Sequence, residues 1–147
     1  MKKLYNWDAE KGIATCEIIV NNQIFHGEAH CHAEDRDYGN ELTGCMIAET
    51  RSAIKYLAYV RHERTIVLKA FKHLYKCLST SKHFNKKSYE AKMLYRQIKI
   101  YQAEIDELKL QINSLKDNLK EYIDFKDSLY RKFRAKKTAK GEVDEIQ

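Results

Sequence analysis

Histidine and acidic side chains gather in one short segment of this chain. Residues 26–32 read His-Gly-Glu-Ala-His-Cys-His, in which histidine, glutamate and cysteine are residue types that bind zinc. Strand alternation places Cys31 on the opposite face from His30 and His32, and no second ligand pair with zinc spacing occurs elsewhere. His30 and His32 could share a metal with a glutamate of the same sheet, but we favour a polar surface or a ligand contact. We predict no metal and no cofactor.

Residues 3–31 predict a small antiparallel meander that would carry these side chains. Asn21-Asn22 can form a two-residue turn with positive φ, and residues 8–12 have the composition of an earlier turn. The Asn-Asn turn places Cys16 opposite Gly27 and Glu17 opposite His26, with the other pairs following in register. One face is then apolar and small, suited to a closely packed helix, whereas the other is the wet or ligand-facing side.

Two long helices follow, because the chain has no glycine and no proline between Cys45 and Lys140. We predict a β region and loop over 1–39, a first helix over 40–80, a connection over 81–87, a second helix over 88–134 and a disordered tail over 135–147. Apolar residues at heptad spacing over 94–122 indicate a coiled-coil seam in the second helix. The fold class is α+β, mostly α: a small N-terminal antiparallel β-hairpin or meander, then two long antiparallel helices.

The chain has the length of a single domain, but two long helices and a short β region do not enclose a complete core. We therefore expect an oligomer. No apolar run approaches the roughly 20 residues that cross a bilayer, and the first residues do not resemble a signal peptide. We expect a cytoplasmic protein with reduced cysteines, since its four cysteines include no CxxC pair.

Positive charge is concentrated in the middle of the chain. Residues 51–87 contain ten Lys or Arg and one acidic residue, whereas residues 1–50 contain four and nine. This asymmetry indicates an anionic partner. Arg61 and Arg64 fall on the apolar seam of the first helix, which leaves two interpretations open: a local shift of the seam with snorkelling arginines, or a polar pocket for phosphate.

Motifs for nucleophilic catalysis, phosphate loops and dinucleotide binding are missing from the sequence. It has no GxGxxG, no GxxxxGK[ST] and no GxSxG segment. We predict that the protein is not an enzyme.

Residues 27–35, Asp37-Tyr38, Gly44, Ile47-Ala48 and Arg51 with Lys55 resemble small phage proteins of low-GC bacteria. They are most similar to the first family of Thoeris anti-defence proteins, phage sponges for cyclic ADP-ribose-type signals. The likeness covers about 30 residues and the layout of a hairpin followed by long helices. It implies sequestration of the signal without cleavage, in pockets at a dimer interface, with dimers or dimer-based hexamers that also hold cyclic di- or trinucleotides. It also implies action in the cytoplasm of the infected bacterial host, against Thoeris or related effectors.

The ligand contacts of that family do not align to positions of this chain, so the candidate residues come from charge and position. A phosphorylated adenine ligand needs cations for its phosphates and an aromatic plane for its base. The histidines would close the site from the β-hairpin of a neighbouring subunit. The candidates are Arg51, Lys55, Arg61 and Arg64 for phosphates, Tyr59 or Phe84 for the base, and His26, His30 and His32.

Two other functions compete with the signal sponge. The basic stretch over 51–87 could bind nucleic acid or inhibit a nucleic-acid enzyme such as a CRISPR effector. Alternatively, the chain could be a coiled-coil adaptor whose charges only contact solvent. Salt-dependent binding of DNA or RNA would favour the first of these alternatives.

Overall fold

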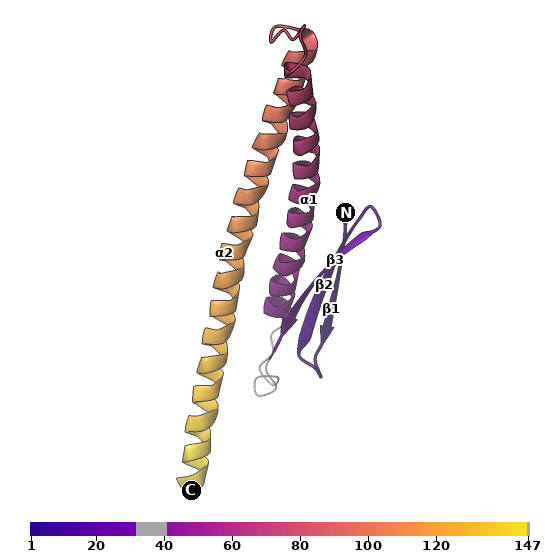
Figure 1. Ribbon diagram of the computed structural model, residues 1–147. Helices are drawn as coiled ribbons and strands as arrows, with labels where there is room; N and C mark the ends of the chain where they lie inside the picture. The colour runs from indigo at the N-terminus through magenta and orange to yellow at the C-terminus, as the bar shows by residue number, and fades with distance from the viewer. Residues whose placement is uncertain (32–40, 147) are drawn as a thin grey trace. The chain divides into compact units, whose positions relative to one another are not determined.

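The computed structural model describes residues 1–31 and 41–146, with side chains up to residue 140. Three strands, β1 (Lys2–Asp8), β2 (Ile13–Val20) and β3 (Gln23–His30), precede two helices, α1 (Glu41–Ser79) and α2 (Tyr89–Ile146) (Figure 1). The fold is α+β and mostly α, as the sequence predicts. Neither described helix is long and apolar enough to cross a membrane.

The three strands form one antiparallel sheet in the order β1-β2-β3, with β2 in the centre. Asn21 and Asn22 make the β2–β3 turn with φ values of 48° and 63°. Val20 pairs with Gln23, and every later pair follows the predicted register as far as Ile13 and His30. The turn chemistry was therefore sufficient to determine which side chains share a face.

Contacts divide the chain into two compact units. Residues 1–56 and 114–147 form the first, here called the sheet unit, and residues 57–113 form the second, here called the hairpin unit. Each helix contributes residues to both units.

The core of the sheet unit lies between the apolar face of the sheet and the two helices. Ala14, Cys16 and Ile18 of β2 are buried against Ile47 and Ala48 of α1, and α2 adds three partly buried side chains, Leu119, Tyr122 and Ile123. Gly27 permits the close approach of β3 to α1, because a Cβ there would lie 2.6 Å from the amide nitrogen of Ser52. The prediction of a small-residue face covered by a helix is confirmed.

The hairpin unit is an antiparallel pair of helices. Phe71 of α1 contacts Tyr101 of α2, and Tyr75, one turn later in α1, contacts the earlier Tyr95. Ser88 caps α2, since its hydroxyl accepts a hydrogen bond of 3.3 Å from the amide of Ala91. The predicted seam is confirmed: every seam position between residues 94 and 122 is buried or half-buried.

The prediction of a disordered tail over 135–147 was wrong, because α2 continues to Ile146. Residues 134–140 are Arg, Ala, Lys and one Thr, most of which favour a helix without any tertiary contact. The Thr138 hydroxyl donates a 3.0 Å hydrogen bond to the carbonyl of Arg134, as a side chain within a helix does. The end of the apolar seam therefore marks the end of the packing and not the end of the helix.

Candidate functional site

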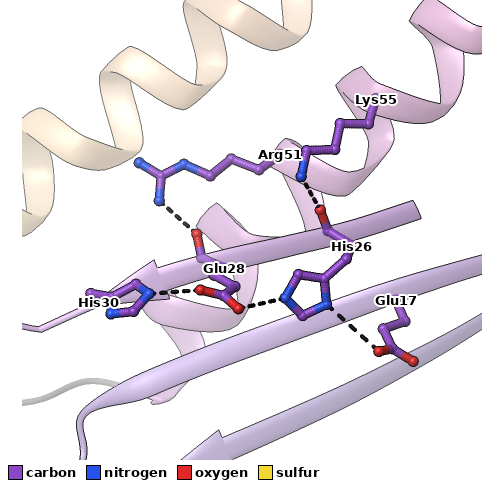
Figure 2. A network of polar contacts seen from close by, with 6 residues as sticks. All are labelled: Glu17, His26, Glu28, His30, Arg51 and Lys55. Carbon is purple, nitrogen blue, oxygen red and sulfur yellow. Dashed lines mark hydrogen bonds and ion pairs between the residues drawn. The ribbon is translucent and has the colours of Figure 1, made fainter. Parts of the chain in front are cut away.

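Three cations cover the open edge of β3. The guanidinium Nη1 of Arg51 donates to the carbonyl oxygen of Glu28 at 2.6 Å, and the Lys55 ammonium donates to that of His26 at 2.6 Å (Figure 2). Lys126 of α2 lies 3.4 Å from the carbonyl oxygen of His30. An edge strand otherwise presents unpaired backbone groups to other chains, and lysine or arginine is a common protection.

Alternation along β3 explains why these three carbonyls are involved. In an antiparallel strand, alternate residues direct their backbone groups toward opposite edges. The amide of Cys31 points toward β2, since it donates a 2.7 Å hydrogen bond to the carbonyl of Gly12. The backbone groups of the even-numbered residues before it therefore point away from β2, toward the open edge. Arg51 and Lys55 are one helical turn apart on α1, which places both over that edge.

The side chains of the same residues form a polar chain on the outer face of the sheet. The Nε2 atoms of His26 and His30 lie 2.7 and 2.8 Å from the two oxygens of Glu28. An ionised carboxylate only accepts hydrogen bonds, so both rings carry a proton on Nε2. The Nδ1 atom of His26 lies 3.6 Å from Glu17 on β2 (Figure 2). Hydrogen bonds from His30 and His26 hold the pKa of the Glu28 carboxyl below its ordinary value.

A pocket of about 560 Å³ adjoins both groups of polar contacts. Its cationic lining comes from Arg51, Lys55 and Lys116, and Ile54 and Leu119 supply apolar surface. From β3, the lining includes His26, Gly27, Glu28 and His30. Pockets of this size hold small-molecule ligands.

The chemistry of this lining suits an anion with an apolar part. Arg51 uses Nη1 on the strand, and a guanidinium has five N–H donors, so others remain for a ligand. Lys116 lies one helical turn before Leu119, so a charge and an apolar surface are next to each other. Among the described residues that line the pocket, three cations face one acidic residue, Glu28.

The structure brings together four of the nine predicted site residues. Arg51, Lys55, His26 and His30 of the same chain line this pocket. His32 lies outside the described residues. The sequence analysis missed Lys116, which only the packing of α2 brings to the pocket. The heptad spacing identifies Leu119 as a seam residue. Because Lys116 lies one helical turn before Leu119, this spacing could also have indicated Lys116.

The remaining four predicted residues, Tyr59, Arg61, Arg64 and Phe84, belong to the hairpin unit. Arg64 forms an ion pair of 3.4 Å with Glu104 and lies over the Tyr101 ring, 5.7 Å from its centroid. Arg64 also lines a second pocket of about 460 Å³, whose wall is mostly apolar. The position of Arg64 favours the snorkelling interpretation, because its guanidinium contacts Glu104 and Tyr101 at the edge of the seam.

Within residues 1–31 and 41–140, no group of three His, Cys, Asp or Glu side chains is arranged to hold a metal ion. Glu28 separates the two imidazoles by taking one hydrogen bond from each. The four cysteines are free thiols.

Comparison of the chain with family models, with curated proteins and with solved structures found no match in any of the three.

Proposed function

We propose that this protein captures a small phosphorylated ligand in the pocket beside β3 and holds it without cleaving it. The observation that carries the proposal is the convergence of Arg51, Lys55 and Lys116 on one pocket that also has an apolar wall. Phosphate groups would take the guanidinium and ammonium donors, and a base or ribose would pack on Ile54 and Leu119.

The resemblance to the Thoeris anti-defence family supports a particular ligand class. Signals of the cyclic ADP-ribose type, and cyclic di- or trinucleotides, combine phosphates with a planar base, which matches a lining of cations and apolar groups. Sequestration in the cytoplasm of an infected bacterium, by a homodimer or a dimer-based hexamer, would keep such a signal from its effector.

Capture without chemistry fits the types of residue in the lining. The pocket contains acid–base groups, but its described lining residues include no serine, cysteine or threonine that could serve as a nucleophile. His26 and His30 each hydrogen-bond Glu28, so their Nε2 protons are directed at the protein. We infer that the histidines shape the wall of the pocket.

The experiment incubates the purified protein with cyclic ADP-ribose isomers and with cyclic di- and trinucleotides. The protein is separated from free ligand and denatured, and the released molecules are identified by mass. Recovery of intact ligand is the expected result. A cleaved product would contradict capture without chemistry, and recovery of no ligand would contradict the proposal.

A pair of variants one turn apart on α2 tests the location of the site. Lys116→Glu reverses a charge in the pocket lining, whereas Lys120→Glu makes the same change at an exposed residue outside it. We expect Lys116→Glu to lower ligand recovery at least tenfold, about 1.4 kcal/mol or more. Equal recovery from the two variants would place the ligand elsewhere.

A further inference from the structure

The closed end of the hairpin unit is strongly basic. Residues 69–99, from the last third of α1 through the connection to the start of α2, contain nine Lys or Arg and a single acidic residue, Glu90. All nine cationic side chains are exposed. In Figure 1 this segment is the end where α1 passes into α2. We call residues 69–99 the basic tip.

The cations of the basic tip have no carboxylate partner among the residues that the structure describes. Within residues 69–99, no Lys or Arg forms an ion pair with any of those residues. Arg64, just outside the tip, shows the contrasting case, because Glu104 neutralises it at 3.4 Å. A cluster of unneutralised cations produces a positive potential that attracts polyanions.

Aromatic rings lie among these cations. The ring of Tyr75 contacts that of Phe84 edge-on, with 6.0 Å between the centroids. It also contacts the tilted ring of Tyr95, with 6.3 Å between the centroids. Tyr95 is 50% exposed, Tyr89 is 74% exposed, and the Lys99 ammonium lies 4.6 Å from the centre of the Tyr95 ring. Open ring surface and ammonium groups therefore occur together.

A pocket of about 340 Å³ combines both features. Tyr75 and Tyr95 line it together with Lys86, Lys92 and Ala91. A flat ring could enter beside the tyrosines while an attached phosphate reached the lysines. This pocket is made by the hairpin unit alone, so it is separate from the ligand pocket of the sheet unit.

We propose that the basic tip binds single-stranded nucleic acid. Phosphates of the backbone contact the exposed lysines, and an unpaired base stacks against Tyr95 at the pocket. Proteins that bind single strands without sequence preference combine a cationic surface with stacking rings in this way. A duplex lacks the unpaired base that the pocket accepts. The number of cations suits a polymer better than a ligand with one or two phosphates.

The test measures fluorescence anisotropy of a labelled 20-nucleotide oligothymidylate over a series of salt concentrations. Lys86→Glu combined with Lys92→Glu reverses two charges at the pocket, and Lys109→Glu combined with Lys120→Glu makes the same change at exposed sites outside the tip. We expect the first pair to weaken binding at least tenfold. If each lysine contacts one phosphate, the negative slope of log affinity against log salt should become shallower by about 1.4.

The control pair should change the affinity less than threefold, because its charges lie outside the tip. Tyr95→Ala should weaken binding about tenfold with an unchanged salt slope, since it removes stacking and no charge. Phe125→Ala, which truncates another exposed ring of α2, is the matched control and should leave the affinity unchanged.

Three results would overturn the proposal: equal losses in the tip and control pairs, equal affinity for a 20-base-pair duplex, or binding to vesicles with anionic lipid but not to the oligonucleotide. Lys116→Glu should leave oligonucleotide binding intact. This inference therefore stands or fails separately from the proposed ligand pocket.

Discussion

The cations of the sheet unit and those of the basic tip have different partners. Arg51 and Lys55 each donate to a backbone carbonyl of β3, whereas none of the cations in residues 69–99 pairs with a carboxylate in the described part of the chain. The first pair protects a strand edge and lines a concave pocket, and the second group covers an exposed helical end. We therefore propose that the cations of the sheet unit serve a small ligand and that those of the basic tip serve an extended polyanion.

The sheet unit should be most sensitive to a change at Gly27. A Cβ there would meet the carbonyl oxygen of Ala48 and the amide nitrogen of Ser52, backbone atoms that cannot rotate away. We expect Gly27→Ala to lower the free energy of unfolding by about 4 kcal/mol, beyond the usual cost of overpacking. Denaturant unfolding followed by circular dichroism measures this change.

Gly44→Ala is the matched control for Gly27→Ala. Its Cβ would lie 3.0 Å from the Cβ of Ala14 and 3.3 Å from the Trp7 ring, which are side chains that can move slightly. The gain in helix propensity of about 1 kcal/mol opposes the crowding. If Gly44→Ala lowered the free energy of unfolding as much as Gly27→Ala, the account of the close β3–α1 contact would be contradicted.

The hairpin unit has no sheet and depends on its helical seam. Ile105 is 4% exposed, so Ile105→Ala should lower the free energy of unfolding by about 3 kcal/mol. Leu110→Ala, at a residue that is 65% exposed, should cost less than about 0.5 kcal/mol. Thermal unfolding of both variants provides the comparison. Equal melting temperatures would show that the seam is not the core.

The protection of the β3 edge should depend on the cation. Arg51→Ala removes the 2.6 Å hydrogen bond to Glu28 and should cost about 1 kcal/mol. Lys126→Ala removes only a 3.4 Å contact and should cost less than about 0.5 kcal/mol. Hydrogen exchange of the β3 amides reports both changes locally. Faster exchange in Lys126→Ala than in Arg51→Ala would reverse the assigned roles.

The smallest expected effect concerns Glu28. Its carboxyl pKa lies below the ordinary value, so the ionised form is stabilised in the fold. That contribution is complete above the unfolded pKa of about 4.3 and is lost as pH falls through the folded pKa. Replacing His26 and His30 by alanine together should return the Glu28 pKa toward its ordinary value. Carbon-detected NMR titration measures it, and an unchanged pKa would show that the histidines are not the cause.

Much of the fold could be predicted because it depends on local chemistry. The Asn21-Asn22 turn determined the strand register, and the absence of glycine and proline between Cys45 and Lys140 predicted long helices. The end of α2 was misjudged because apolar spacing reports packing, and a helix rich in alanine and lysine continues without it. Local sequence signals therefore predicted which helices and strands form better than they predicted where the helices end.

The candidate site was predictable only in part. Register and charge indicated His26, His30, Arg51 and Lys55, since these residues lie on neighbouring elements. Lys116 comes from a segment 61 positions after Lys55 in the sequence, and only tertiary packing brings it to the same pocket. Charge counting also grouped Arg61 and Arg64 with the site, although Arg64 pairs with Glu104 in the other unit.

The most direct test measures two affinities on two variants. Cyclic ADP-ribose isomers and the oligothymidylate are each titrated against Lys116→Glu and against the Lys86→Glu, Lys92→Glu pair. We expect the first variant to lose only the small ligand and the second to lose only the oligonucleotide. Parallel loss of both ligands in either variant would contradict the account of two separate anion-binding sites.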